Sequence, residues 1–401
     1  MEALTLQLAQ QAVGLSSPNP RVGCVITDAN GTILGQGHTQ APGQAHAEAM
    51  ALQHAHSQGH SVKGATAWVS LEPCSHYGRT PPCCQALIQA QVAQVIVAVQ
   101  DPNPLVAGKG LQALRQAGIE VHMGSLVWAQ AAAELNIGFF SRMQRQRPYV
   151  RLKIAASLDG ITALRNGTSQ WITSPAARAD SHAWRHRACA ILTGIGTVLH
   201  DNPRLDVRLD SDFHPDFDQT AAHPSLPLRV VLDSHLRTPV NAKILQAPGR
   251  TLIYTLQQRS PNHALLAPDF AQRVEIVQAP PDAQAHLSAS WSAQLDWRWI
   301  LENLGQRQIN ELHIEAGHTL NGSLLRAGWV DEVLLYLAPS LLGSGFGIAN
   351  LSTQSLQSLT DGIKLHFLEC TPIGPDLRIR ARIPSTDSVQ FIHTFNPNLT
   401  S

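Results

Sequence analysis

The stretch LEPCSHYGRTPPC (residues 71–83) decides the fold of the first third of the chain, taken together with the tripeptide His46-Ala47-Glu48. A His-x-Glu followed by Pro-Cys and a second cysteine is the residue set of a hydrolytic zinc deaminase. One histidine and two thiolates hold zinc with an open fourth position, where the pKa of a bound water falls toward neutrality. We predict His46, Cys74 and Cys83 as zinc ligands, with Glu48 as the proton carrier that does not bind the metal.

Helix geometry constrains how these residues can meet. Residues two apart on a helix point to nearly opposite faces, so His46 and Glu48 can share a site only at the first turn of a helix. Cys74 follows a predicted strand, and Cys83 is predicted to begin a helix after two prolines. Two helix N-termini would then face the metal, and their partial positive charge favours thiolates. The neighbouring Cys84 is expected to point into the packing of its helix.

Composition places the chain among globular proteins of two or three domains. It has 401 residues, 44% of them hydrophobic, and 29 basic residues balance 29 acidic ones. Zero net charge argues against a nucleic-acid footprint. Residues 1–17 lack the features of a signal peptide, and no apolar run reaches the length of a membrane span. Clustered cysteines indicate metal binding in a reducing, cytoplasmic compartment, and the remaining three are expected to be small buried residues: Cys24, Cys189 and Cys370.

The first segment alternates strands and helices, which predicts a mixed α/β layer with helices against one sheet. The predicted strands lie at 22–27, 32–37, 65–73, 94–100 and 119–124, and the first two form a hairpin around Asp28–Gly31. The predicted helices lie at the N-terminus and at 46–57, 83–91 and 111–118. A polar and basic break is expected at 141–148, so we place domain boundaries at 1–145, 146–383 and a tail at 384–401.

The second segment is predicted to be another α/β domain with a largely parallel sheet. Its strand candidates lie at 149–157, 190–199, 228–234, 251–256, 274–278, 311–317 and 332–339. The polar, proline-containing stretch at 210–227 is expected to be a surface excursion. The alanine- and serine-rich stretch at 279–296 is expected to link elements. The tail has weak periodicity and predicts little order.

Several strings in both segments resemble the bifunctional deaminase/reductases of riboflavin biosynthesis. In the first segment they are residues 18–25 (PNPRVGCV), 46–48 and 71–83, with eight residues between the two cysteine ligands. Nucleoside and tRNA deaminases place that second cysteine three positions after the first. In the second segment they are residues 153–160, 169–173, 194–199, 201–205, 229–234 and 315–317. The resemblance runs in the family's order over roughly residues 10 to 383.

This resemblance implies a fold and two consecutive reactions. The fold would be α/β, a cytidine-deaminase-like three-layer domain followed by a dihydrofolate-reductase-like α/β domain. The first would remove the exocyclic 2-amino group of a diaminopyrimidinone that carries a phosphoribosylamino arm. The second would reduce the ribosyl arm of 5-amino-6-(5-phosphoribosylamino)uracil to ribityl with NADPH. The resemblance also implies small-molecule substrates and a homo-oligomer, with neither nucleic acid nor membrane as a partner.

The resemblance further implies site residues in the second domain, matched position by position. The dinucleotide would be contacted by Ala155, Trp171, Thr197, Asp201 and Ser234. The residues themselves, apart from the resemblance, add a candidate phosphate-binding stretch for the dinucleotide: Gly317, His318, Thr319, Leu320, Asn321, Gly322 and Ser323. The substrate would be contacted by Ser169, Arg185, Leu205, Arg208 and Glu315. Ala316 departs from the family, which usually has glycine there, and its extra methyl bears on close backbone approach to phosphate.

Read from the residues alone, this second site leaves alternatives open. Gly194-x-Gly196 lacks the third glycine of a dinucleotide fingerprint, so a Rossmann fold is not supported. Residues 315–323 follow a strand and precede a predicted helix at 323–328, where backbone N–H groups can bind phosphate; the alternative is an ordinary joint between elements.

Five residues carry their own alternatives. Arg185 and Arg208 can fork onto a substrate phosphate or be solvated surface arginines. Trp171 can lie near nicotinamide or in a core. Asp201 can assist proton movement as hydride reaches the ribose C1′, or be a plain helix N-cap. Ser234, which opens the stretch 234–237, can help to recognise a ribose 2′-phosphate and so favour NADPH over NADH.

Two other functions are kept as alternatives to the bifunctional enzyme. In one, the second domain is a cofactorless binding or scaffolding module; residues such as Lys153, Ser169 and Thr197 speak against it. In the other, the chain is a nucleic-acid-editing deaminase with an accessory domain. The neutral charge and the long spacer between the cysteines speak against that one.

Overall fold

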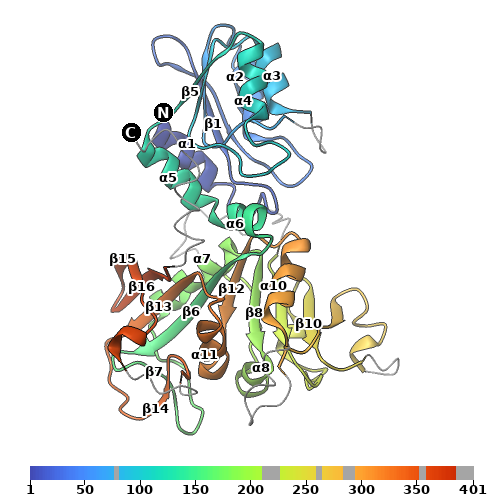
Figure 1. Ribbon diagram of the computed structural model, residues 1–401, viewed down its shortest axis with the longest axis vertical. Helices are drawn as coiled ribbons and strands as arrows, with labels where there is room; N and C mark the ends of the chain where they lie inside the picture. Colours follow the sequence, from blue (N-terminus) through green and yellow to red (C-terminus); the bar gives the residue numbers. More distant parts are fainter. Residues whose placement is uncertain (76–80, 210–225, 259–263, 283–293, 352–357, 385–401) are drawn as a thin grey trace. The chain divides into compact units, whose positions relative to one another are not determined.

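The computed structural model describes residues 1–75, 81–209, 226–258, 264–282, 294–351 and 358–384, and it divides into two compact units (Figure 1). The first unit runs from Met1 to Gln146, and the second begins at Arg147. Nearly all of the stretch at 210–227, most of that at 279–296 and nearly all of the tail at 384–401 lie outside the described residues.

The first unit contains a mixed five-stranded sheet in the order β2-β1-β3-β4-β5. Antiparallel β1 and β2 form the predicted hairpin, closed by a hydrogen bond from the Gly31 N–H to the Asp28 carbonyl. Strands β3, β4 and β5 are parallel, which the intervening helices make possible. The strands are β1 (Gly23–Thr27), β2 (Ile33–His38), β3 (Thr66–Val69), β4 (Gln94–Val97) and β5 (Glu120–Met123).

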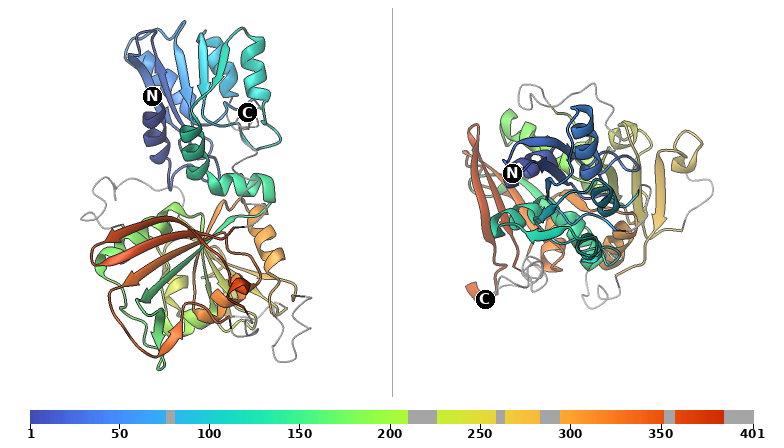
Figure 2. Two further views of the ribbon diagram at one scale, coloured as in Figure 1. Left: turned by 60° about the vertical axis from the view of Figure 1, so that its left-hand side comes forward. Right: turned by 90° about the horizontal axis from the view of Figure 1, so that it is seen from above.

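Helices cover both faces of this sheet and make three layers. Figures 1 and 2 show α1 and α5 on one face and α2, α3 and α4 on the other. Two glycines let helices approach closely, because a Cβ on Gly23 would lie 2.0 Å from the Thr5 carbonyl oxygen, and one on Gly35 would lie 2.2 Å from that of Ala51. The helices are α1 (Glu2–Gln10), α2 (Ala47–Ser57), α3 (Cys83–Gln89), α4 (Lys109–Gln116), α5 (Leu126–Leu135) and α6 (Ile137–Arg145).

The break expected at 141–148 is wrong over most of its length, because α6 continues to Arg145. Phe140 and Ser141 are buried, so the polar and basic residues form only the outer side of an amphipathic helix. Arg142 and Arg145 lie in its last turn, where cations favour the helix dipole. The helix ends at Gln146, which has a left-handed backbone conformation.

The second unit contains a nine-stranded sheet in the order β11-β10-β9-β8-β12-β6-β13-β16-β15. Strands β11 through β13 in this order are parallel, which confirms the largely parallel sheet; an antiparallel hairpin completes one edge. The strands are β6 (Tyr149–Ser157), β8 (Ala190–Gly194), β9 (Leu228–Leu232), β10 (Thr251–Thr255), β11 (Val274–Gln278), β12 (Glu311–Glu315), β13 (Glu332–Ala338), β15 (His366–Ile373) and β16 (Asp376–Arg382). A separate small sheet pairs β7 (Ile161–Leu164) with β14 (Gly345–Gly347).

Helices also cover both faces of this second sheet. Buried residues of α10 and α11 pack with Val150 and Leu152 of β6, whereas α8 and α9 pack with Ile191 of β8 on the opposite face. Helix α7 contributes Ala177 to a third cluster with Tyr336. The helices are α7 (Pro175–Arg187), α8 (Ile195–Asp201), α9 (Lys243–Gln246), α10 (Trp297–Gln306) and α11 (His318–Arg326), with short 3-10 turns η1 (Ala264–Leu266) and η3 (Leu359–Asp361).

Two predicted boundaries in this unit are wrong. The strand expected at 190–199 ends at Gly194, and α8 begins at the next residue. Val198 is buried, and it packs in the hydrophobic cluster that contains Ile191 of β8 and Ile244 of α9. The helix expected to begin at Ser323 begins five residues earlier, at His318.

A buried charge network joins the central strands β12, β6 and β13. The Arg151 side chain, 1% exposed, donates to Glu332 at 3.0 Å and to Glu311 at 2.9 Å. Its guanidinium also lies 4.6 Å from the ring centroid of Trp184. Burial alone would raise the pKa of Glu332, but Arg151 and Arg380 outweigh it and lower that pKa to about 2.

Replacing Arg151 by alanine should destabilise the second unit by about 3–5 kcal/mol, because Glu332 loses one of its countercharges in a buried site. Urea unfolding followed by tryptophan fluorescence measures this. The matched control is Arg250→Ala, since the Arg250 side chain is 68% exposed in its ion pair with Glu275 and should cost about 0–1 kcal/mol. Equal small losses in both variants would show that the buried network does not stabilise the unit.

Candidate active sites

Three side chains of the first unit converge as donors for one metal ion. The Nδ1 of His46 lies 3.4 Å from the Sγ of Cys83 and 3.7 Å from the Sγ of Cys74. One donor atom from each residue lies within 4.8 Å of the others. Tetrahedral zinc with bonds of about 2.0–2.3 Å places its donors roughly 3.5 Å apart, so the borderline-soft donor set and its spacing both fit Zn²⁺.

The starts of two helices position these donors, as predicted. His46 is the N-cap of α2, and Glu48 lies in the first turn. Cys83 is the first residue of α3, and its N–H donates to the Sγ of Cys74 at 3.3 Å. The Cys84 N–H donates to the Cys74 carbonyl at 3.2 Å. The N-terminus of α3 therefore holds both the backbone and the sulfur of Cys74.

The charges around the three donors suit metal binding and proton transfer. Hydrogen bonds from Cys83, and the nearby His46, lower the pKa of Cys74 to about 4. Glu48 is 3% exposed, and burial together with the charge of Cys74 raises the pKa of Glu48 to about 7. A carboxyl group of that pKa can both accept and release a proton near neutral pH, as a general acid–base group must.

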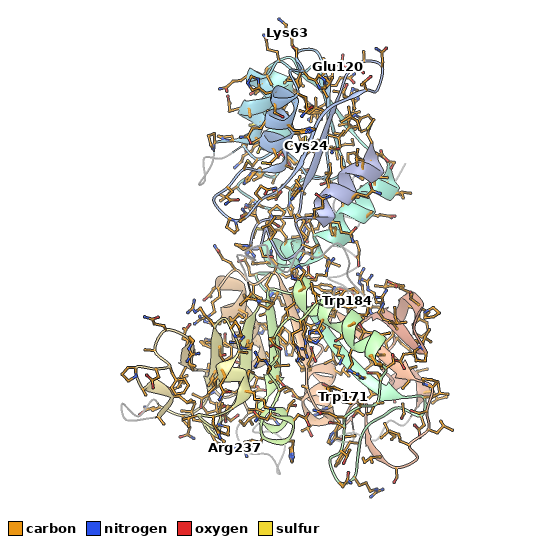
Figure 3. The ribbon with its side chains drawn as sticks, turned by 180° about the vertical axis from the view of Figure 1, so that it is seen from behind. Cys24, Lys63, Glu120, Trp171, Trp184 and Arg237 are labelled. Atoms are coloured by element: carbon orange, nitrogen blue, oxygen red, sulfur yellow. The ribbon has the colours of Figure 1, made fainter. Side chains whose placement is uncertain are left out.

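The other cysteines divide into buried and exposed. Cys84 is buried, as expected, and is not one of the three donors. Cys24 is buried inside the first sheet (Figure 3) and Cys189 is half-buried. The expectation for Cys370 is wrong: it lies exposed on edge strand β15. His76, which lies between the two cysteine ligands in the string 71–83, falls outside the described residues.

The second unit contains a cavity of about 1320 Å³ where parallel strands end and helices begin. Open α/β sheets bind ligands at this edge. All of the residues that the sequence assigned to the second site line this cavity except Gly322. They are Ala155, Ser169, Trp171, Arg185, Thr197, Asp201, Leu205, Arg208, Ser234, Glu315, Gly317, His318, Thr319, Leu320, Asn321 and Ser323.

The start of α11 gives this cavity hydrogen-bond donors. Gly317 is the N-cap, so residues 318–322 are helical rather than the expected loop. The Asn321 side chain is 2% exposed and donates to the Ile348 carbonyl, while its Oδ1 has no hydrogen-bond partner among the described residues. Backbone N–H groups of the first turn fit a phosphate, and the orphaned Asn321 Oδ1 fits a hydrogen-bond donor such as a ribose hydroxyl; NADPH carries both.

Gly322 and Ala316 have packing roles. A Cβ on Gly322 would lie 2.0 Å from the Asn350 carbonyl oxygen, so this glycine admits the neighbouring chain and does not face the cavity. Ala316 is partly buried: it packs against the hydrophobic core and also lines the cavity.

The two arginines of the substrate set have different surroundings. Arg185 donates to both carboxylate oxygens of Glu315, at 2.5 and 2.9 Å, and Lys153 lies 3.9 Å from the same carboxylate. Arg208 has a side chain that is 62% exposed, and its backbone N–H donates to Nδ1 of His182. Arg185 therefore holds Glu315, whereas the Arg208 guanidinium is accessible to a ligand.

His182 is a cavity residue that sequence reasoning missed. It receives the Arg208 backbone N–H, and its Nε2 lies 3.4 Å from an Arg208 guanidinium nitrogen. As one of 19 histidines outside any string that resembles the family, it offered no signal.

Two alternatives from the sequence are excluded by position. Trp171 is 70% exposed and stacks with the Arg178 guanidinium at 4.5 Å, so it is not a core residue. Figure 3 shows Trp171 well apart from Trp184. Asp201 is the last residue of α8 and not an N-cap, and the Ser169 hydroxyl donates to it at 3.3 Å. Of residues 234–237, only Ser234 lines the cavity.

Fold and sites together define a class of protein: a zinc deaminase unit joined to an α/β unit with a large ligand cavity. The model of the cytidine and deoxycytidylate deaminase zinc-binding region matches residues 2–99, and that of the RibD C-terminal domain matches residues 148–379. The chain belongs to the RibD family of riboflavin biosynthesis. It is a bifunctional enzyme, a deaminase and a reductase, whose cofactors are zinc and NADPH.

Individual relatives agree with this assignment over almost the whole chain. The riboflavin biosynthesis protein RibD of Escherichia coli is 45% identical over 380 residues, covering 94% of this chain and 96% of that protein. The structure of Acinetobacter baumannii RibD is 38% identical, with a TM-score of 0.81 over 96% of this chain and 98% of that one. A Thermotoga maritima deaminase/reductase structure is 28% identical, with a TM-score of 0.78 over 95% of this chain and 97% of that one. Within the described part of the chain, no helix is long and apolar enough to cross a membrane.

Full-length protein should bind about one zinc ion per chain, as one three-residue ligand set predicts. Cys83→Ala should lose this ion, because it removes one of the three donors. Cys84→Ala is the matched control, since it truncates the adjacent buried cysteine and should keep the metal. Elemental analysis after dialysis measures both, and zinc loss confined to Cys84→Ala would contradict the ligand set.

Proposed function

We propose that the first unit removes the exocyclic 2-amino group of a phosphoribosylamino-pyrimidinone, with His46, Cys74 and Cys83 as the zinc ligands and Glu48 as the proton carrier. The observation that supports it most directly is the buried Glu48 carboxyl in the same helix turn as one of three converging donors. Zinc, when bound, supplies a water of lowered pKa at its fourth position.

The role of Glu48 follows from its burial. A carboxylate with a pKa raised to about 7 takes one proton from water and delivers it to the ring nitrogen. It then takes the second proton from the hydroxyl of the tetrahedral adduct and delivers it to the departing amine. Hydrolysis forms one carbon–oxygen bond and breaks one carbon–nitrogen bond, and ammonia leaves. Water is consumed, so no oxidant or reductant is needed.

In the second unit, the cavity residues named from the sequence bind NADPH and the deaminated substrate. The first turn of α11 holds phosphate-bearing parts of the dinucleotide, the Asn321 Oδ1 accepts from one of its hydroxyl groups, and Trp171 lines the open cavity. NADPH, when bound, supplies the hydride that reduces the ribosyl C1′. The accessible Arg208 binds the substrate phosphate, while Glu315 is held in place by Arg185 to receive substrate hydroxyls.

The remaining assignments are proposals of the same kind. The deaminase domain spans residues 1–145, the reductase domain 146–383 and the tail 384–401. A homo-oligomer is supported by the family resemblance. A cytoplasmic location is supported by the two cysteine ligands, which must remain reduced thiolates. Light scattering of the purified chain and cell fractionation test these two.

Glu48→Gln should abolish most deamination, by about 10²–10⁴-fold, because the amide cannot carry a proton. Zinc content should stay unchanged, since Glu48 is not a donor, and reduction of added 5-amino-6-(5-phosphoribosylamino)uracil should continue. Release of ammonia from the diaminopyrimidinone is the measurement. Glu120→Gln, a change at an exposed glutamate of β5, is the control and should keep full activity. Wild-type deamination by Glu48→Gln would refute the assigned role.

Arg208→Ala should raise the KM for the phosphorylated uracil by about 10- to 100-fold, in line with a lost hydrogen bond to a charged group. The KM for NADPH should change much less. Oxidation of NADPH is followed by absorbance, with NADH compared in the same assay. The control is Arg237→Ala, because Arg237 does not line the cavity. A chain that oxidises no NADPH with this substrate, or equal effects of the two variants, would contradict the proposal.

A further inference from the structure

Glu72 is a buried carboxylate that lies two residues before a zinc ligand, and among the described residues its side chain accepts four hydrogen bonds, all from backbone N–H groups. It is 3% exposed. One oxygen accepts the N–H groups of Gly108 at 2.9 Å and Asp101 at 3.2 Å. The other accepts those of Gly110 at 2.9 Å and Leu111 at 3.3 Å. A single side chain thus binds the loop after β4 and the first turn of α4.

Only a carboxylate suits this position. Two oxygens of an ionised carboxyl offer about four acceptor sites, which matches four N–H donors. An amide at the same place has one oxygen and an NH₂ group that would face two N–H groups. The negative charge also lies at the N-terminus of α4, where the helix dipole favours it.

Close packing transmits this anchoring to the zinc ligand. A Cβ on Gly110 would lie 2.0 Å from the Pro73 carbonyl oxygen, so α4 packs directly against the residue between Glu72 and Cys74. On its other side, Cys74 receives N–H groups from the start of α3, including that of Cys83. The ligand is therefore held between two helix N-termini.

We propose that Glu72 is a positioning residue for the metal site: it anchors the Pro73–Cys74 segment to α4 and so places the Cys74 sulfur for zinc. Metal affinity depends on donors that are held in place before the ion binds, and loss of a supporting contact typically costs 10–100-fold. Glu72 touches neither the donors nor substrate. The inference rests on the proposed ligand set of His46, Cys74 and Cys83.

The test compares Glu72→Gln with Glu2→Gln in the full-length chain. Glu2 is a matched control, because its carboxylate accepts the N–H and hydroxyl of Ser125 at the start of α5, in the same unit. Zinc affinity is measured by chelator competition, and the thiolate-to-metal and ligand-field absorption bands of the cobalt-substituted protein report donor geometry. Reduction of added substrate by the second unit checks that each chain is otherwise intact.

Glu72→Gln should bind zinc about 10- to 100-fold more weakly and shift the cobalt bands, with unchanged reductase turnover. Glu2→Gln should match the wild type in all three measurements. Wild-type affinity and cobalt bands in Glu72→Gln would overturn the inference, as would equal losses in Glu2→Gln.

A second variant covers the case in which Glu72→Gln unfolds the first unit. Gly110→Ala keeps the carboxylate but pushes on the Pro73 carbonyl, so it should also weaken zinc binding and shift the cobalt bands. Normal affinity in Gly110→Ala would then overturn the inference. A wild-type chain that binds no zinc would instead refute the proposed ligand set.

Discussion

Convergence of one nitrogen and two sulfur donors on a single point is the constraint on which the first unit depends. His46, Cys74 and Cys83 come from three separate segments, and their donor atoms lie within 4.8 Å of one another. Thiolates near each other repel, so the site needs compensating positive ends, and the starts of α2 and α3 supply them. Glu48 is buried by the same arrangement, which raises its pKa into the working range of a proton carrier.

The second unit also forms its site where helices begin, but this site is a large cavity. Its ligands are large, and the cavity needs residues from many segments between Lys153 and Phe346. Parallel strands bring these segments together, because their carboxyl ends meet at one edge and helices such as α11 begin there. Two sets of charged side chains in this unit form ion pairs with each other. Arg185 holds Glu315 at the cavity, and the buried Arg151 network joins strands β12, β6 and β13.

Local signals in the sequence predicted much of both units. The strings that contain His46, Cys74 and Cys83 predicted the ligand set. His46 and Cys83 lie at the starts of helices α2 and α3, and the prolines before Cys83 show where α3 begins. Features that depend on distant packing were not predicted. The polar residues on the outer side of α6 made this helix look like a linker in the sequence. Gly322 lies against the Asn350 carbonyl, which leaves no room for a side chain. Strand β16 was not predicted either, although its arginines alternate with apolar residues as in a half-buried strand; they pair with the buried Glu332 and with Asp180. Glu72 gave no signal, since its partners lie 29 to 39 residues away.

The metal's coordination shell is the most direct measure of this arrangement. X-ray absorption at the zinc edge of the full-length chain should show two sulfur neighbours at about 2.3 Å and two nitrogen or oxygen neighbours at about 2.0–2.1 Å, one from His46 and one from water. Three sulfur neighbours would mean that Cys84 or another cysteine binds, and a shell without sulfur would mean that Cys74 and Cys83 do not. Either result would contradict the site described for the first unit.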